Sequence, residues 1–169
     1  MAEIAIDAHS SQRRVLRAVG EVEDCFWALF STTFHQTFSR VLARTRDVPW
    51  PLSVREGLRE FLELLAAEPA YVRANLAGVR ALGAEGGFRL EMAIEAFTAF
   101  LTPGYENAGD RPVPPLMAEL IGASVLHVIT QHVADDRIAE LPDALPQLLG
   151  VALMPFCAAD DIDALLAIT

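Results

Sequence analysis

The chain has 169 residues, the length of one ordinary domain, and 53% of them are hydrophobic. It carries 13 basic and 23 acidic residues, which give a formal net charge of −10. So acidic a chain repels nucleic acid at long range, and any DNA contact must come from a locally basic stretch. Proline and glycine total 20 residues and no low-complexity run occurs, which argues against wholesale disorder.

The cysteines and the stretches without charged residues indicate in which compartment of the cell the protein is expected. Cys25 and Cys157 lie among apolar residues without Cys-x-x-Cys spacing, which predicts reduced, buried thiols. Residues 1–20 lack the apolar central run of a secretory signal. Three stretches, 25–39, 120–134 and 144–159, contain no charged residue. Each is shorter than the roughly 18–20 residues that span a bilayer. We therefore expect a cytoplasmic protein with no membrane partner.

Residues 1–20 are the locally basic part, with three bases and two acids. The pattern predicts a short helix over residues 2–8 and a second over 11–19, with Gly20 as its C-cap. The side chains expected to face outward on the second helix are Gln12, Arg13, Arg14 and Arg17. Two short helices across a tight turn are typical of a helix-turn-helix, although many helical proteins contain such corners.

This stretch resembles the helix-turn-helix of the TetR family of transcriptional regulators. The residues in register with the family are Ile4, Ala5, Ala8, Ser11, Leu16, Arg17, Val19, Gly20 and Glu23. At the turn, His9 and Ser10 replace the family's glycine and valine, and Leu16 replaces its phosphate-contacting tyrosine. The family's first helix would precede residue 1. The resemblance implies that the four outward side chains bind operator DNA, the arginines at phosphates and Gln12 at a base.

The next predicted helix covers residues 21–46 and carries a phenylalanine ridge. Its members are Phe26, Phe30, Phe34 and Phe38, and Leu42 continues the series. Each step of four residues overshoots a full turn by about 40°, so the ridge rotates by roughly 160° around the helix. Alone, this is the pattern of a long core helix. In the TetR resemblance it is the linker helix between the DNA-binding segment and the body, and prolines at residues 48–51 end it.

The rest of the chain shows helical periodicity and no strand pattern. We expect helices over residues 52–67, 70–82, 88–101, 114–134 and 144–158, with loops at 83–87 and 102–115. Ser53 and Glu56 have the spacing of a capping box. The charged residues expected to be solvated on the same helix are Arg55, Arg59, Glu60 and Glu63. Pro155 should bend or end the last helix.

The order of these helices also resembles the TetR body, as does the Glu-Pro-Ala turn at residues 68–70. The predicted fold class is therefore all-α. The resemblance implies two parts, a partial helix-turn-helix over residues 1–20 and a ligand-binding and dimerisation domain over 21–169.

Apolar side chains on several predicted helices are candidates for a ligand site, with a few polar groups to orient the ligand. They are Phe30, Phe34, His35, Phe38, Phe61, Leu65, Tyr71, Asn75, Met92, Phe97 and Met117. The same side chains would also fill a core without a cavity. The resemblance implies that a small apolar ligand shifts the 21–46 helix and alters DNA binding. The alternative is a TetR-like ligand-binding or dimerisation module that has lost DNA binding, which the acidic body favours.

The last two long predicted helices are apolar on more than one face, so a monomer would bury only part of each. We expect a symmetric homodimer. Its candidate interface residues are Ile121, Gly122, Val125, Leu145, Leu149, Ala152 and Leu153. The alternative is a monomer with a thicker core.

No catalytic constellation is visible in the sequence. No serine lies in a Gly-x-Ser-x-Gly elbow, and there is no glycine-rich phosphate loop. His127 and His132 are five residues apart, about 140° around a helix, so they do not share a metal ion. We expect no enzyme activity, no metal and no other cofactor.

Overall fold

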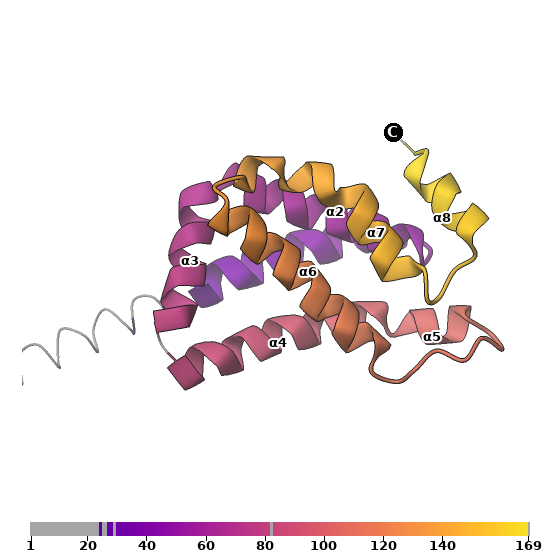
Figure 1. Cartoon of the computed structure of the whole chain (residues 1–169), viewed down its shortest axis with the longest axis horizontal. Coiled ribbons are helices and arrows are strands. Elements are labelled where there is room, and N and C mark those ends of the chain that lie inside the picture. Colours follow the sequence, from indigo (N-terminus) through magenta and orange to yellow (C-terminus); the bar gives the residue numbers. More distant parts are fainter. Residues whose placement is uncertain (1–23, 25–26, 29, 82, 169) are drawn as a thin grey trace, which may run out of the picture. The chain divides into compact units, whose positions relative to one another are not determined.

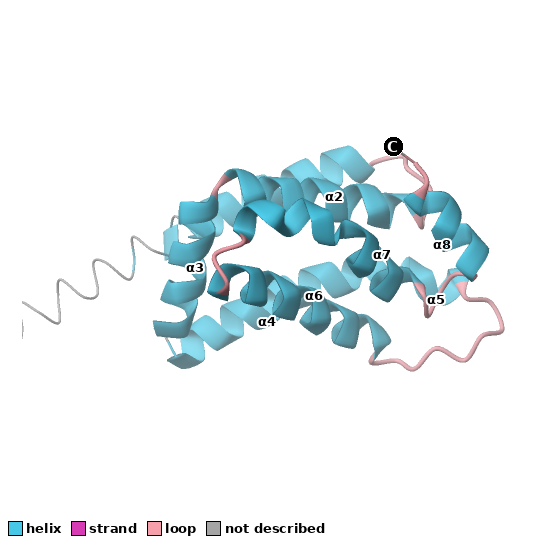
Figure 2. Cartoon of the chain, turned by 45° about the horizontal axis from the view of Figure 1, so that its top comes forward, coloured by secondary structure: helices cyan, strands magenta, loops and turns pink. Residues whose placement is uncertain are grey.

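The computed structural model describes residues 24, 27–28, 30–81 and 83–168 (Figure 1). Its contacts divide the chain into two compact units, residues 1–36 and residues 37–169. Within the described residues, all regular structure is helical and no strand occurs, which confirms the predicted all-α class (Figure 2). Residues 30–45 are helical, and the chain leaves this helix at residue 46, as the prolines at 48–51 predict.

The body, residues 37–169, contains the helices that follow the proline-rich break. They are α2 (Leu52–Ala67), α3 (Pro69–Ala81), α4 (Gly83–Leu101), α5 (Pro103–Asn107), α6 (Met117–Ala134), the 3-10 helix η1 (Ile138–Ala144), α7 (Leu145–Leu153) and α8 (Ala159–Leu166). Helix α2 packs on η1 and α7, and α4 packs on α3 and α6. Helix α2 is thus covered by elements that lie far after it in the sequence.

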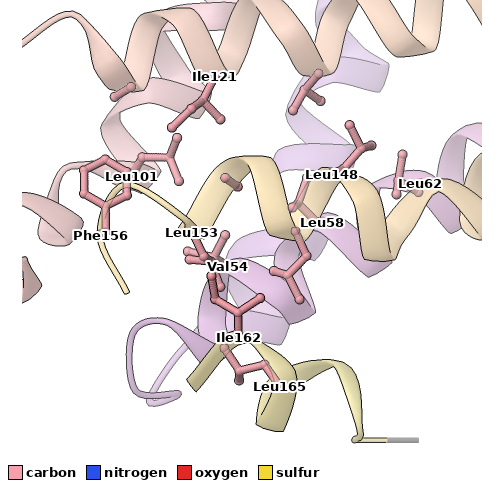
Figure 3. Packing of buried hydrophobic residues seen from close by; sticks show 14 of the residues in the cluster. Val54, Leu58, Leu62, Leu101, Ile121, Leu148, Leu153, Phe156, Ile162 and Leu165 are labelled. Carbon is pink, nitrogen blue, oxygen red and sulfur yellow. The ribbon is translucent and has the colours of Figure 1, made fainter. Parts of the chain in front are cut away.

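Helix α2 forms because apolar residues recur on one of its faces. Val54, Leu58 and Leu62 follow at intervals of four, and all three are buried. They meet buried side chains from other helices in one cluster (Figure 3). The largest fully buried members from outside α2 are Leu101, Ile138, Leu141, Leu149, Leu153 and Phe156. The apolar face of α2 is therefore packed against this core.

Three aromatic rings pack together beside α5. The ring of Phe156 lies edge-on to Trp50, at a centroid distance of 5.8 Å, and to Tyr105, at 5.2 Å. Gly104 backs onto the same rings: a Cβ atom there would lie 2.7 Å from the nearest Trp50 carbons and 2.8 Å from Phe156 Cγ. The glycine is therefore required for the close approach of α5 to the aromatic rings.

Replacing Gly104 with alanine should lower the free energy of unfolding by about 1–3 kcal/mol, because two rigid rings must move to admit the methyl group. Gly150 is the matched control. It lies in α7, and a Cβ atom added there would meet no atom within 4 Å. Gly150→Ala should therefore stabilise the protein by roughly 0.5–1 kcal/mol through helix propensity. Urea denaturation of both variants measures the two effects, and equal effects would contradict the packing of Gly104.

Several predicted boundaries differ from the structure. The loop predicted over residues 83–87 is wrong, because α4 begins at Gly83. Gly86 is buried there, and a side chain would collide with the Val79 carbonyl oxygen, so this glycine serves close helix packing. The helix predicted over 144–158 ends at Leu153, since Pro155 lacks an N–H group for the helical ladder. Helix α8 follows and was not predicted.

The predicted capping box at the start of α2 is also wrong. The N-cap residue is Pro51, and no side chain caps this helix end. The Glu56 carboxylate instead binds arginines. The expectation that Arg55 is solvated is likewise wrong, because only 7% of the residue is exposed.

Candidate functional site

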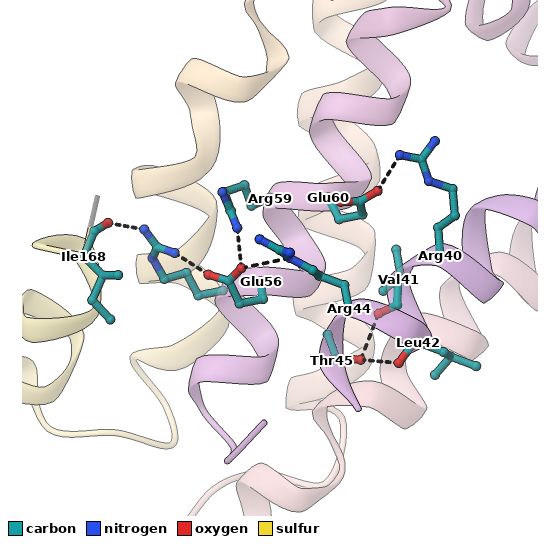
Figure 4. A network of polar contacts seen from close by, with 10 residues as sticks. Arg40, Val41, Leu42, Arg44, Thr45, Glu56, Arg59, Glu60 and Ile168 are labelled. Atoms are coloured by element: carbon teal, nitrogen blue, oxygen red, sulfur yellow. Dashed lines mark hydrogen bonds and ion pairs between the residues drawn. The ribbon is translucent and has the colours of Figure 1, made fainter. Parts of the chain in front are cut away.

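Four arginines and two glutamates form a polar network between α2 and the end of the helix that precedes it (Figure 4). Arg40 and Arg44 come from residues 37–45, and the other members, Arg55, Glu56, Arg59 and Glu60, come from α2. Residues four apart lie on the same side of a helix. The spacing of 40 and 44 therefore matches that of 56 and 60. Arg40 Nη2 lies 2.8 Å from Glu60 Oε1, and Arg44 Nε lies 3.4 Å from Glu56 Oε2.

Glu56 is the centre of this network. Its Oε1 accepts a hydrogen bond from Arg55 Nη1, and its Oε2 accepts one from Arg59 Nη2 in addition to pairing with Arg44. Burial of the carboxyl group opposes its ionisation. The hydrogen bonds and charges of Arg59 and Arg55 outweigh that effect and hold the pKa of Glu56 below its ordinary value. Glu56 is therefore ionised at neutral pH.

Arg55 connects the network to the end of the chain. Its side chain is 8% exposed, and its Nη2 donates a hydrogen bond to the carbonyl oxygen of Ile168, which follows α8. One guanidinium group thus joins the last described residues to Glu56.

Arg59 is only partly satisfied. Its hydrogen bond to Glu56, despite desolvation, raises the pKa of its guanidinium above the ordinary value. Its Nε atom is buried and has no hydrogen-bond partner among the described residues. Among the described members of the network, this N–H group is the buried donor that lacks a partner.

Beside the ion pairs, the side chain of Thr45 lies close to Gly57 of α2. Thr45 is buried, and its hydroxyl donates to the Val41 carbonyl oxygen at 2.9 Å. A Cβ atom on Gly57 of α2 would lie 3.4 Å from Thr45 Cγ2 and 3.0 Å from the ring of Phe100. The small residue at position 57 lets the helix end approach α2. Residues 40–45 and α2 together form what we call the clamp.

The predicted ligand-binding residues fall in both units. In the unit of residues 1–36, Phe30 and Phe34 stack with ring centroids 6.2 Å apart, and His35 Nδ1 lies 2.7 Å from the Ser31 carbonyl oxygen. These contacts follow the helix from one turn to the next, as the spacing of the ridge predicts.

In the body, the predicted ligand-binding residues separate by burial. Four of them are partly buried and pack against the core: Phe61, Leu65, Phe97 and Met117. Tyr71 and Asn75 are also partly buried, and the Asn75 side chain donates to the Tyr71 carbonyl oxygen at 2.9 Å. Phe38 and Met92 are exposed, at 37% and 48%. The ligand site stays a prediction.

Six of the seven predicted dimer residues are buried within the chain's own core. They are Ile121, Gly122, Val125, Leu149, Ala152 and Leu153, while Leu145 is partly buried against the same core. The apolar residues that α6 and α7, with their flanking residues, leave exposed are Leu116, Leu120, Val151 and Met154. Both the interface residues and the dimer stay predictions.

The predicted DNA-binding residues, Gln12, Arg13, Arg14 and Arg17, lie outside the described residues. Among the described residues, no group of three or more histidine, cysteine, aspartate or glutamate side chains is placed to hold a metal ion. No described helix is long and apolar enough to cross a membrane. Comparisons with protein-family models, curated proteins and solved structures gave no match.

The sequence analysis did not predict the polar network, because it placed Arg55, Arg59 and Glu60 in solvent and Glu56 in a capping box. One signal could have revealed part of it. Arg40 and Arg44 repeat the spacing of Glu56 and Glu60, and the break at residues 48–51 folds one helix back toward the next. The bond from Arg55 to Ile168 spans 113 residues and has no counterpart in local sequence.

Proposed function

We propose that this chain is a TetR-like one-component transcriptional regulator. In this proposal, residues 1–20 bind operator DNA, and the helical body binds a small apolar ligand. The observation that carries the proposal is the clamp, in which two ion pairs and the Thr45–Gly57 contact fix residues 40–45 to α2. A ligand that displaces α2 therefore also displaces the end of the helix that follows the DNA-binding segment in the sequence.

The ion pairs of the clamp are weak enough for a bound ligand to break them. The side chains of Arg40 and Arg44 are 63% and 53% exposed, so each ion pair contributes at most about 1 kcal/mol. Two conformations that a ligand interconverts differ by a few kcal/mol. Contacts of this size hold one arrangement in the absence of ligand and still yield to a ligand of moderate affinity.

The proposal includes a homodimer, because an operator with two half-sites needs two recognition segments at a defined spacing. Exposed apolar side chains beside α6 and α7 support it. Leu116, next to the start of α6, and Met154, next to the end of α7, are 63% and 69% exposed in a single chain. Large exposed apolar side chains favour association with another protein surface where they form a contiguous patch.

A second candidate function is a ligand-binding or dimerisation module without DNA binding. The charge distribution favours it. Residues 1–20 carry three bases and two acids, which leaves ten bases and 21 acids, a net charge of −11, for residues 21–169. Only the short N-terminal segment could offset this repulsion from DNA.

A gel-shift assay on the DNA upstream of the chain's own gene, at 50 mM and at 200 mM salt, tests the first function. We expect binding that weakens as salt increases. The double variant Arg13→Ala/Arg14→Ala should reduce the slope of log K against log salt by about 2, because two phosphate contacts are lost.

Arg73→Ala/Arg137→Ala is the charge-matched control, since both side chains lie in the body. It should leave the slope unchanged. Failure of the unmodified chain to shift this DNA at 50 mM salt would contradict the regulator. If sedimentation showed a dimer in the same sample, the module without DNA binding would be favoured.

A further inference from the structure

We infer that the polar network on α2 is a binding site for a small oxyanion, a carboxylate or a phosphate, held between Arg44 and Arg59. The inference stands on the network alone. It does not depend on DNA binding by residues 1–20.

The first argument is local charge. Four arginines meet Glu56 and Glu60 in the network, and Glu63 acts on Arg59 from the same helix. Four positive and three negative charges leave a surplus of one positive charge. This surplus stands out in a chain whose net charge is −10. A small anion of one charge would neutralise it.

The second argument is the count of hydrogen-bond donors. Three arginines share the single carboxylate of Glu56. A guanidinium group carries five N–H donors and no acceptor, so the network holds far more donors than its carboxylates can engage. Both terminal nitrogens of Arg55 already donate hydrogen bonds, Nη1 to Glu56 and Nη2 to the Ile168 carbonyl oxygen. The free donors belong to the other arginines.

Arg59 supplies the decisive feature. Its Nε atom is buried and unpaired among the described residues, although buried N–H groups are almost always hydrogen-bonded. Arg44 pairs with Glu56 through its Nε atom, which lies 3.4 Å from Glu56 Oε2. An oxyanion has several lone pairs and can bridge two guanidinium groups, which is the recognition for which arginine is best suited.

Part of this place faces solvent. The side chain of Arg44 is 53% exposed and that of Arg59 is 32% exposed, whereas the Nε atom of Arg59 and the side chain of Arg55 are buried. A small anion could therefore reach the exposed parts of Arg44 and Arg59 from solvent, and it would engage Arg59 Nε only if that guanidinium turned toward it. An apolar ligand would strip water from these charges and gain nothing in return.

Isothermal titration of the full chain with inorganic phosphate, and separately with acetate, tests the inference at pH 7 and constant ionic strength. We expect saturable binding of at least one of the two anions. A response to phosphate alone would identify a phosphate site, and a response to acetate alone would identify a carboxylate site. Arg44→Gln should weaken the binding roughly 10–100-fold, as expected for the loss of a charge-assisted hydrogen bond.

Arg137→Gln is the matched control, because the side chain of Arg137 is 46% exposed, close to the 53% of Arg44, and forms ion pairs elsewhere in the body. It should bind as the unmodified chain does. Circular dichroism checks that both variants are folded. Thermal unfolding gives a second readout: anion at about one hundred times its dissociation constant should raise the midpoint by roughly 5–10 °C, and Arg44→Gln should lose most of this shift. Absence of saturable binding, or equal binding by Arg44→Gln, would overturn the inference.

Discussion

Replacing Phe156 with alanine should lower the free energy of unfolding by about 3–5 kcal/mol, the range for a large aromatic residue removed from a packed core. The side chain is fully buried. Its ring lies against Trp50 and Tyr105. The backbone of Gly104 is also close, since a Cβ atom there would lie 2.8 Å from Phe156 Cγ. Because these neighbours are rigid rings, the cavity would collapse only partly. Urea denaturation followed by circular dichroism measures the loss.

Phe88→Ala is the matched control, because it removes the same atoms from a side chain that is 59% exposed. Its effect should stay within about 0.5 kcal/mol, as for most surface substitutions. Similar losses in the two variants would show that Phe156 does not pack as the structure has it. Phe156→Leu should recover much of the stability, since it refills part of the cavity.

The sequence could predict the elements of this fold because helix formation and amphipathicity are local. Helix α2 was predicted over 52–67 and lies at Leu52–Ala67. The apolar residues Val54, Leu58 and Leu62 on this helix are all buried. A repeat of 3.6 residues determines both the helix and its inward face. For that reason the all-α class followed from pattern alone.

The same local reasoning failed where a residue's role depends on a distant partner. Gly86 was assigned to a loop because glycine usually marks one, yet it lies in α4 against the backbone of α3. Glu56 has the spacing of a capping residue from Ser53, yet its partners are arginines. Nothing in the neighbouring sequence distinguishes these alternatives, since tertiary contacts decide between them.

The interface residues illustrate a different limit. Sequence indicated correctly that α6 is apolar on more than one face. It could not show which face the chain itself covers. Ile121 and Val125 were assigned to a partner, but they are buried in the core, whereas Leu120 on another face is 58% exposed. The choice of face depends on how α4 and α7 pack around α6.

Replacing Glu56 with alanine should lower the free energy of unfolding by roughly 2–4 kcal/mol at pH 7, because a buried charge loses its partner. Arg55 would keep its charge in a place where its side chain is 8% exposed. The ion pair to Arg44 would also be lost, which should loosen the clamp. Glu56→Gln should cost less than Glu56→Ala, since the amide oxygen still accepts a hydrogen bond. Urea denaturation of the three proteins gives the comparison.

The pH dependence of this effect follows from the lowered pKa of Glu56. Hydrogen bonds and charges from Arg59 and Arg55 exceed the effect of burial, so the carboxyl ionises more readily in the folded state than in the unfolded state. Its contribution to stability is therefore fully present above the unfolded pKa, at about 4.3. It is lost as the pH falls through the lower pKa of the folded state. The difference between the unmodified chain and Glu56→Gln should shrink in that acid range.

Glu63 is the control, since it lies in α2 seven residues after Glu56 and is exposed. Glu63→Ala should change stability by no more than about 0.5 kcal/mol at pH 7. If Glu56→Ala cost no more than Glu63→Ala, the guanidinium of Arg55 would have found another anion or access to water. In that case residues 40–45 would be held by Arg40 and the Thr45–Gly57 contact alone, and Glu56 could not be the centre of the clamp.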